Sequence, residues 1–278
     1  MMSHHEDHFA TRDGLSLYEQ FWLPPGEPRA TVVMVHGVTE HSGRYARFAG
    51  ELNGRGYAAY AMDLRGHGRS DGDRILVRRF DEHLDDVELL LGRVAQRHAG
   101  KPVFLFGHSM GGAIMGLLAA TRRPHAHGVI LSAPAVVVGG GVFPVLRQVA
   151  GLVSAVWPTL RLVHMGCGFI SRDPAVVEAF RNDPLVFHGG FPVRTGAEIL
   201  RAADRLQTEA EHLTLPLLVL HGTGDRVTDP RGSRLLVARA GSTDKTLRLY
   251  PGLYHELLSE PEREQVLADL LAWLDGHR

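Results

Sequence analysis

The chain has 278 residues, of which 44% are hydrophobic and 22% charged, a composition that fits one globular domain, or one domain with an insertion, around a large core. Its formal net charge of −1 argues against a nucleic acid or an acidic membrane surface as a partner bound through charge. A single cysteine, Cys167, excludes a disulfide within the chain and indicates a reducing, cytoplasmic compartment.

The sequence starts with MMSHHEDHFATRDG, which contains no apolar stretch of the kind found in a secretory signal. Its histidines His4, His5 and His8 have the chemistry of metal ligands, but so polar a segment is predicted to be a solvated tail. Residues 15–23 follow and alternate apolar with polar side chains, which predicts an antiparallel strand at the edge of a sheet.

Short apolar runs then alternate with longer helical patterns along most of the chain. Strands are expected at residues 31–36, 57–62, 103–106, 128–131, 217–221 and 246–250. Helices are expected between and after them, at residues 43–55, 80–98, 110–121, 231–240 and 260–274. This alternation predicts the α/β class, with a mostly parallel central sheet that is flanked by helices on both faces.

The alternation is interrupted between residues 135 and 213, where apolar helical pieces are broken by glycines and prolines. Roughly eighty residues are too many for a simple connection in a compact domain. We therefore predict a helical cap at residues 135–213, inserted into an α/β core formed by residues 1–134 and 214–278. Because the cap connects two strands of the sheet, it should lie over their carboxyl edge, where ligands bind in such folds.

One expected strand leads directly into Gly107-His108-Ser109-Met110-Gly111, which places a serine at a strand-to-helix corner. In such a corner the serine backbone is strained at positive φ, and the residues two before and two after it must be very small. The strain raises the hydroxyl above the sheet edge, at the N-terminus of the next helix. This predicts that Ser109 is a nucleophile; the alternative is that it only caps the helix.

A serine hydroxyl becomes a good nucleophile when a base takes its proton and an acid orients that base. On α/β-hydrolase sheets these partners follow the serine in the order acid, then histidine. We predict that the acid is Asp225, because it follows an expected strand in a tight glycine-rich turn. Asp229 precedes Pro230 and is better explained as a helix N-cap, and Asp204 as a surface residue of the cap.

The base is expected after the last strand, where His255 lies on a loop. The closing helix is expected just beyond it, because Ser259 and Glu262 have the spacing of a capping box. His36 and His221 also end strands, but each precedes a glycine turn and neither has the required place in the chain order. We therefore predict that His255 is the base.

Serine hydrolases also need two backbone N–H groups that bind the oxyanion of the tetrahedral intermediate. We predict that Met110, the residue after the serine, supplies one of them. Val38, in the loop after the first parallel strand, should supply the other. This loop is expected to be braced by a polar network of Glu40, His41 and Arg44.

Several longer motifs accompany these residues: HGVTEHSGRY (36–45), DLRGHGRSDG (63–72), GHSMGG (107–112), LSAPA (131–135), SRDP (171–174), NDPL (182–185), LHGTGD (220–225) and YPGLYHE (250–256). With them, nearly the whole chain resembles the bacterial monoacylglycerol lipases of the α/β-hydrolase superfamily, of the serine aminopeptidase S33 and lysophospholipase-like type. The resemblance implies hydrolysis of monoacylglycerols to glycerol and fatty acid without a metal or another cofactor. It also implies a triad of Ser109, Asp225 and His255, with Val38 and Met110 as donors to the oxyanion.

Two positions depart from the family pattern. Thr39 stands where glycine is common, and Phe180 stands where relatives often carry a tyrosine that can hydrogen-bond the glycerol head. A broader carboxylesterase or a lysophospholipase would use the same triad and is the alternative function; a ligand-binding protein without catalysis is another. Dehalogenases and epoxide hydrolases need an aspartate in place of Ser109 and are excluded. Asp63, in the second motif, is interpreted as part of a structural turn.

The expected cap contains an apolar stretch at residues 142–163. Its uncharged run, 149–160, is well short of the about 20 residues that a membrane span requires. Three- and four-residue steps predict one helical stripe, with further apolar residues beside it: Phe143, Leu146, Val149, Val153, Val156 and Leu160, then Val145, Leu152 and Trp157. We expect a lid that lines an acyl tunnel with one side and touches membranes or micelles with the other. The alternative is a helix buried by other cap residues or by a second subunit in a homodimer.

Overall fold

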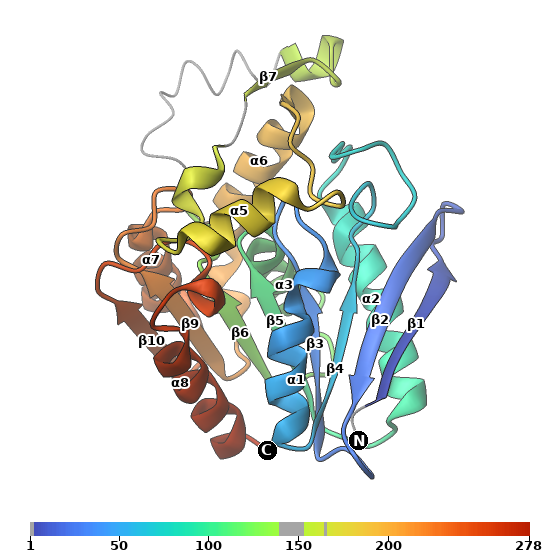
Figure 1. Cartoon of the computed structure of the whole chain (residues 1–278), viewed down its shortest axis with the longest axis vertical. Coiled ribbons are helices and arrows are strands. Elements are labelled where there is room, and N and C mark those ends of the chain that lie inside the picture. Colours follow the sequence, from blue (N-terminus) through green and yellow to red (C-terminus); the bar gives the residue numbers. More distant parts are fainter. Residues whose placement is uncertain (1–2, 139–152, 164–165) are drawn as a thin grey trace.

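The centre of the computed structural model, which describes residues 3–138, 153–163 and 166–278, is an eight-stranded sheet (Figure 1). The strand order is β1-β2-β4-β3-β5-β6-β9-β10. β1 and β2 are antiparallel to their neighbours, and every pair from β4 to β10 is parallel. The strands are β1 (Ser3–Ala10), β2 (Ser16–Leu23), β3 (Ala30–Val35), β4 (Tyr57–Met62), β5 (Val103–His108), β6 (Gly128–Ser132), β9 (Leu217–Gly222) and β10 (Lys245–Tyr250).

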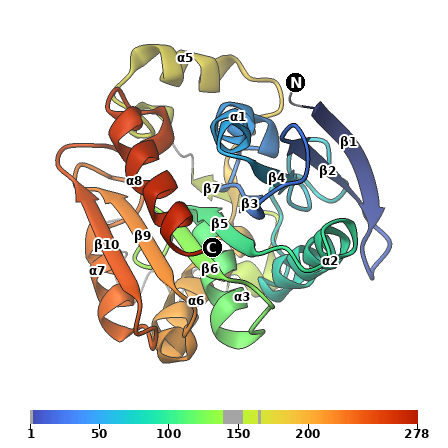
Figure 2. The same cartoon turned by 90° about the horizontal axis from the view of Figure 1, so that it is seen from below.

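Helices cover both faces of this sheet (Figure 2). α1 (Ala46–Gly54) and α8 (Arg263–Gly276) lie on one face, and α2 (Asp81–Arg97), α3 (Met110–Thr121) and α7 (Pro230–Arg239) lie on the other. Successive residues of a strand point to opposite faces, so Val33 joins the core on the α3 side and Val32 the core on the α8 side. Two cores explain why the strands are continuous apolar runs. The predicted α/β class and its mostly parallel sheet are confirmed.

A further layer lies above the carboxyl ends of the parallel strands (Figure 1). It contains β7 (Arg161–Val163), β8 (Phe191–Pro192), α5 (Pro174–Asn182) and the start of α6 (Val193–Glu209). α6 continues downward, where its buried residues share the core of α3. Because α6 thus belongs partly to the core, the division into a core and a cap at residues 135–213 stays a prediction. Short 3₁₀ turns complete the chain: η1 (Ser42–Tyr45), η2 (Cys167–Phe169), η3 (Ala210–His212) and η4 (Leu257–Ser259).

Much of the predicted apolar stripe falls outside the described residues: Phe143, Val145, Leu146, Val149 and Leu152. Of the described part, Val156 and Trp157 are strongly exposed, at 69% and 66%. Within the ranges that the structure describes, no helix is both long and apolar enough to cross a membrane.

Residues 3–10 are largely exposed to solvent, as predicted, but they are not a tail, because they form β1, the edge strand beside β2. His4 stacks on Trp22 and His5 on Phe21, each with ring centroids 4.9 Å apart. These cross-strand pairs supply apolar contacts that the polar sequence of β1 does not predict. β2 is antiparallel as predicted, but it is the second strand and not the edge.

The predicted capping box before the closing helix is also wrong. α8 begins at Arg263 with Glu262 as its N-cap and no side-chain capping bond, and Ser259 lies in the preceding 3₁₀ turn. The cause is Glu260, whose buried carboxylate accepts hydrogen bonds from the backbone of Tyr254 and from Arg172 and so holds the turn away from the helix. The other capping prediction is confirmed, since Asp229 accepts from the second backbone N–H of α7.

Two buried histidines lie between the sheet and α2. His67 and His83 are 1% and 0% exposed, and among the described residues His83 has no hydrogen-bond partner for either ring nitrogen. Burial lowers the pKa of His67 to about 3 and holds the pKa of His83 well below its ordinary value. Both are therefore neutral in the folded protein at neutral pH.

We expect the folded state to lose stability in mild acid. Below about pH 6.5 the unfolded chain protonates these histidines and the folded protein does not, so their stabilisation is complete above that pH and declines as the pH falls toward the folded-state pKa. His83→Met should make the difference in unfolding free energy between about pH 7.5 and about pH 5 smaller. Urea denaturation at both pH values measures this difference in unfolding free energy. The control is His212→Met, at an exposed position, which should keep the full difference; equal behaviour of the two variants would contradict the prediction.

Candidate active site

Ser109 lies at the sharp corner between β5 and α3. Its backbone has φ 55° and ψ −117°, and its side chain makes no capping bond to α3, so the alternative that it only caps the helix is wrong. A Cβ on Gly107 would come within 2.2 Å of the Gly111 carbonyl oxygen, and one on Gly111 within 2.2 Å of the Val35 carbonyl oxygen. The steric need for glycine at both positions is therefore confirmed. The corner presents the serine hydroxyl at the N-terminus of a helix.

The loop after β3 packs directly against the serine. A Cβ on Gly37 would lie 3.1 Å from Cβ of Ser109, which brings the following residue, Val38, beside the nucleophile. The Gly37 N–H donates to the Glu40 carboxylate at 2.6 Å, and the Tyr45 hydroxyl donates to the same oxygen at 2.9 Å. Thr39 is held at φ 70°, the left-handed conformation that glycine adopts most easily. Glu40 thus braces this loop together with Arg44, as predicted, whereas His41 bonds instead to the carboxylate of Asp183 in the overlying layer.

The two N–H groups predicted for the oxyanion remain available. Met110 is the first residue of α3, so its N–H has no helical acceptor. The Val38 N–H makes no hydrogen bond within the described part of the chain.

His255 and Asp225 form a buried pair beside this corner. His255 Nδ1 lies 2.7 Å from Asp225 Oδ2, and since the carboxylate can only accept, Nδ1 carries the proton and Nε2 is left as the base. Asp225 Oδ1 accepts from the backbone N–H groups of Val227 and Thr228 at 2.7 and 3.1 Å. Burial opposes ionisation of Asp225, but the charge of His255 and hydrogen bonds from both His221 and His255 hold its pKa well below the ordinary value.

The ring of His255 lies 4.6 Å from that of His108, the residue directly before Ser109. The structure therefore brings the three predicted residues of the triad to one place at the sheet edge. The Ser109 hydroxyl itself makes no hydrogen bond among the described residues. The hydrogen bond between a nucleophile and its base is often long in enzymes without substrate.

Sequence reasoning missed the contact between His221 and Asp225. The sequence shows His221 only as a histidine before a glycine turn, yet its Nε2 lies 3.2 Å from Asp225 Oδ2. The signal that could have found it is the spacing: a tight turn of three residues after His221 returns the chain so that position 225 meets position 221.

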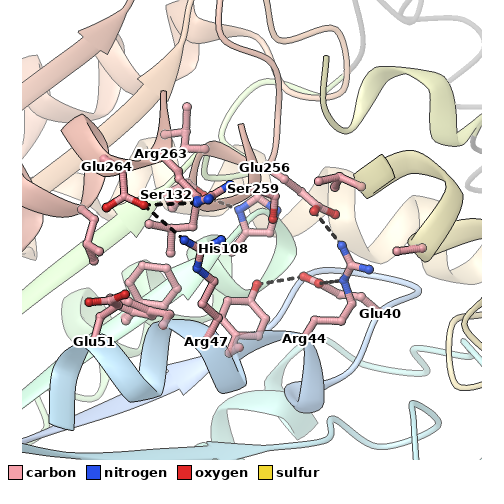
Figure 3. Close-up of a pocket in the computed structure, with 18 residues that line it drawn as sticks. Glu40, Arg44, Arg47, Glu51, His108, Ser132, Glu256, Ser259, Arg263 and Glu264 are labelled. Carbon is pink, nitrogen blue, oxygen red and sulfur yellow. Dashed lines mark hydrogen bonds and ion pairs between the residues drawn. The ribbon is translucent and has the colours of Figure 1, made fainter. Parts of the chain in front are cut away.

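A charged cavity of about 300 Å³ opens beside His108 and Ser132 (Figure 3). Arg44 lies between two buried carboxylates, with Nε 3.1 Å from Glu40 and Nη2 2.6 Å from Glu256. Sequence reasoning missed Glu256, because an acidic residue in a loop usually lies in solvent and its partner is 212 positions away.

Burial raises the pKa of Glu256 against the attraction of Arg44. Burial acts the same way on Glu40, but the nearby His108 and Arg44 outweigh it and hold the pKa of Glu40 at about 2. Arg47 and Arg263 also line the charged cavity, together with the carboxylates of Glu51 and Glu264.

A second, largely apolar cavity of about 250 Å³ lies on the other side of Thr39. Three phenylalanines and Ile170 contribute to its lining: Phe180, Phe187 and Phe191. The Phe187 N–H donates to the Thr39 carbonyl at 2.8 Å and so fastens the overlying layer to the loop after β3. Phe180 lies between the two cavities, since the Arg44 guanidinium also lies over its ring, with Cζ 4.7 Å from the ring centroid.

Asp63 has a structural role, as interpreted from the sequence. Its carboxylate accepts from the backbone N–H and the hydroxyl of Ser42 and from the backbone N–H of Arg69. Over the described ranges, no three histidine, cysteine or carboxylate side chains gather in the way that a metal ion would require.

The chain is similar to proteins of known kind over nearly its whole length. The sequence profile of the family described as serine aminopeptidase, S33 matches residues 26–262. A monoacylglycerol lipase of Mycolicibacterium smegmatis is 40% identical over 98% of this chain and 97% of its own, and a monoglyceride lipase of Rattus norvegicus is 37% identical over 98% and 90%. The crystal structure of the Paleococcus ferrophilus monoacylglycerol lipase, 31% identical, matches 99% of this chain and 100% of its own with a TM-score of 0.84.

Proposed function

Given that the chain belongs to the serine aminopeptidase S33 family, we propose that it hydrolyses the ester bond of monoacylglycerols, releasing glycerol and a free fatty acid. The observation that carries the proposal is a strained serine whose hydroxyl makes no hydrogen bond among the described residues. It follows His108, whose ring contacts the His255 of the buried histidine–aspartate pair. This arrangement occurs in a chain whose relatives are named monoacylglycerol and monoglyceride lipases. It also weighs against a binding protein without catalysis.

The proposed reaction runs through an acyl-enzyme. Ser109 Oγ attacks the ester carbonyl while His255 Nε2 takes its proton, and the N–H groups of Val38 and Met110 bind the resulting oxyanion. His255 then gives the proton to the leaving glycerol oxygen as the ester bond breaks. Water, activated by the same histidine, attacks the acyl-enzyme and releases the fatty acid and Ser109. Asp225 keeps His255 in the tautomer that this cycle needs.

The two cavities lie beside the loop after β3, and neither is lined by Ser109 or His255 itself; their chemistry matches the two ends of such a substrate. A single acyl chain matches the phenylalanine-lined cavity, and a small polyol matches the cavity with Glu40, Arg44 and Glu256. An anionic head group fits the latter poorly, because four glutamates line it against three arginines and its buried Arg44 is already shared by two of the carboxylates. The charge pattern thus favours a neutral monoacylglycerol over the alternative of an anionic lysophospholipid.

We expect the enzyme to turn over 1-monooleoylglycerol much faster than oleoyl lysophosphatidate, in kcat/KM at about pH 8. Glu256→Gln should narrow this ratio about tenfold, because it removes one negative charge next to the phosphate. The matched control is Glu264→Gln, at the rim of the cavity, where the side chain is 68% exposed; it should leave the ratio unchanged. Absence of monooleoylglycerol hydrolysis would overturn the proposed function, whereas an unchanged ratio in Glu256→Gln would overturn only the head-group argument.

The apolar substrate suggests how the overlying layer is used. The large apolar side chains that are exposed in the described part of the chain fall within residues 156–169, and they are Val156, Trp157, Leu160 and Phe169. They lie in or beside the segment predicted to meet lipid. We propose that this apolar surface touches the membrane or micelle that contains the substrate, without charge attraction.

Replacing Val156 and Trp157 together by serine should reduce flotation with phosphatidylcholine liposomes and activity on dispersed monooleoylglycerol. Activity on a soluble short-chain ester should stay the same, since the surface lies outside the proposed chemistry. Gln96→Ser, an exposed change on α2, is the control. If the unaltered protein fails to float with liposomes at low and high salt and sediments as a dimer, these side chains cover a second copy of the chain and not a lipid surface.

A further inference from the structure

His221 is a buried imidazole in contact with the acid of the proposed triad. It is the residue before the last one of β9 and is 0% exposed. Its Nε2 lies 3.2 Å from Asp225 Oδ2 and 3.3 Å from the Thr228 carbonyl oxygen. Its Nδ1 lies 2.6 Å from the hydroxyl of Ser233, which is itself 0% exposed on α7. The imidazole therefore spans the space between α7 and the catalytic carboxylate.

These partners fix which nitrogen of His221 carries the proton. The carboxylate of Asp225 and the carbonyl of Thr228 can only accept, so the proton is on Nε2, which donates to the Thr228 carbonyl and also faces Asp225 Oδ2 at 3.2 Å. Nδ1 is then an acceptor, and the Ser233 hydroxyl donates to it. Ser233 thus holds His221 in the tautomer that serves Asp225, much as a carboxylate orients a metal-bound histidine through its far nitrogen.

Asp225 Oδ2 consequently meets three donors: His255 Nδ1 at 2.7 Å, the Thr228 hydroxyl at 2.9 Å and His221 Nε2 at 3.2 Å. We propose that His221 is a positioning residue for the reaction, which fixes Asp225 Oδ2 in line with His255 and draws off part of its negative charge. The inference rests on the proposed triad. Without this donor the carboxylate turns more freely and holds the proton of His255 more tightly, which makes His255 a stronger but less well-placed base.

Other charged and titratable groups face this arrangement and stay unchanged in the test. His255 faces His108 and Glu256 besides Asp225, and His221 also faces the carboxylate of Asp229 at the start of α7. A shift in the titration of His255 after a change at position 221 therefore reports the lost contact with Asp225.

The test compares His221→Met, which removes the donor, with His221→Gln, whose side-chain amide can still donate to Asp225. For a soluble p-nitrophenyl ester, His221→Met should lower kcat by about 10- to 100-fold with little change in KM. The acidic limb of its kcat/KM profile should move up by about half a pH unit. His221→Gln should recover most of kcat and the parental pH profile. Ser233→Ala should shift both quantities in the same direction by a smaller amount.

His83→Met, at another fully buried histidine, is the control for packing and should leave kcat and the pH profile unchanged. The proposal is overturned if His221→Met keeps the parental pH profile, or if His221→Gln is no better than His221→Met. If His221→Met does not fold, an unaltered kcat and profile in Ser233→Ala overturns it. If the proposed triad is itself wrong, activity survives in Ser109→Ala, and this outcome distinguishes failure of the triad from failure of the His221 proposal.

Discussion

Replacing Ser109 by alanine is expected to lower ester hydrolysis by at least about 10⁴-fold while the protein stays folded. The variant lacks the atom that would attack the carbonyl, so acylation cannot occur. The fold should survive because the Ser109 hydroxyl makes no hydrogen bond among the described residues, and alanine keeps the small Cβ that the corner between Gly107 and Gly111 accepts. Rates with monooleoylglycerol and with a soluble ester measure the loss, and circular dichroism checks the fold.

A fluorophosphonate probe, which reacts with nucleophilic serines, identifies which serine is the nucleophile. It should label the parent protein on the peptide that contains Ser109 and should not label Ser109→Ala. Ser132→Ala is a matched control, because this buried serine ends the neighbouring strand β6 and binds Ser109 and His108 only through its backbone carbonyl. Near-parental activity in Ser109→Ala, or label on another serine, would show that the nucleophile lies elsewhere.

Replacing Asp225 by asparagine is expected to cost about 10⁴-fold in kcat. The new amide group cannot accept at both of its ends, although the carboxylate accepts from His255 on one oxygen and from Val227 and Thr228 on the other. His255 then adopts the wrong tautomer, and its Nε2 no longer takes the serine proton. Steady-state rates on the soluble ester measure the effect.

Asp229→Asn is the control that separates the two candidate acids. Asp229 caps α7 and pairs with the Arg231 side chain, and asparagine is an equally good N-cap, so activity should stay within about twofold. A larger loss in Asp229→Asn than in Asp225→Asn would transfer the role of the acid to Asp229.

Much of the site was predictable because its chemistry depends on local rules of the sequence. Gly107 is required by backbone atoms four residues away and Gly111 by those of the adjoining strand, and the order of Ser109, Asp225 and His255 follows from the direction of the sheet. The continuous apolar strands likewise predicted the two-sided core.

The parts that sequence reasoning missed depend on partners far away in the chain. β1 is polar, and only its pairing with the aromatic residues of β2 makes it a strand. Glu256 and Glu260 are acidic residues that a hydropathy pattern assigns to solvent, yet each is buried by an arginine from another segment, Arg44 and Arg172. The capping box failed for the same reason, because Glu260 turns toward Arg172 and away from the helix.

The shared position of Arg44 limits how this enzyme can be altered in the laboratory. One planar guanidinium joins Glu40 of the loop beside the nucleophile, Glu256 next to His255 and the ring of Phe180 in the overlying layer. A substitution at any of these sites changes the geometry of the other two, so their effects on activity are not additive. A search for new head-group preferences that tests one position at a time would reject changes that are harmless in combination. Libraries should vary positions 40, 44, 180 and 256 together.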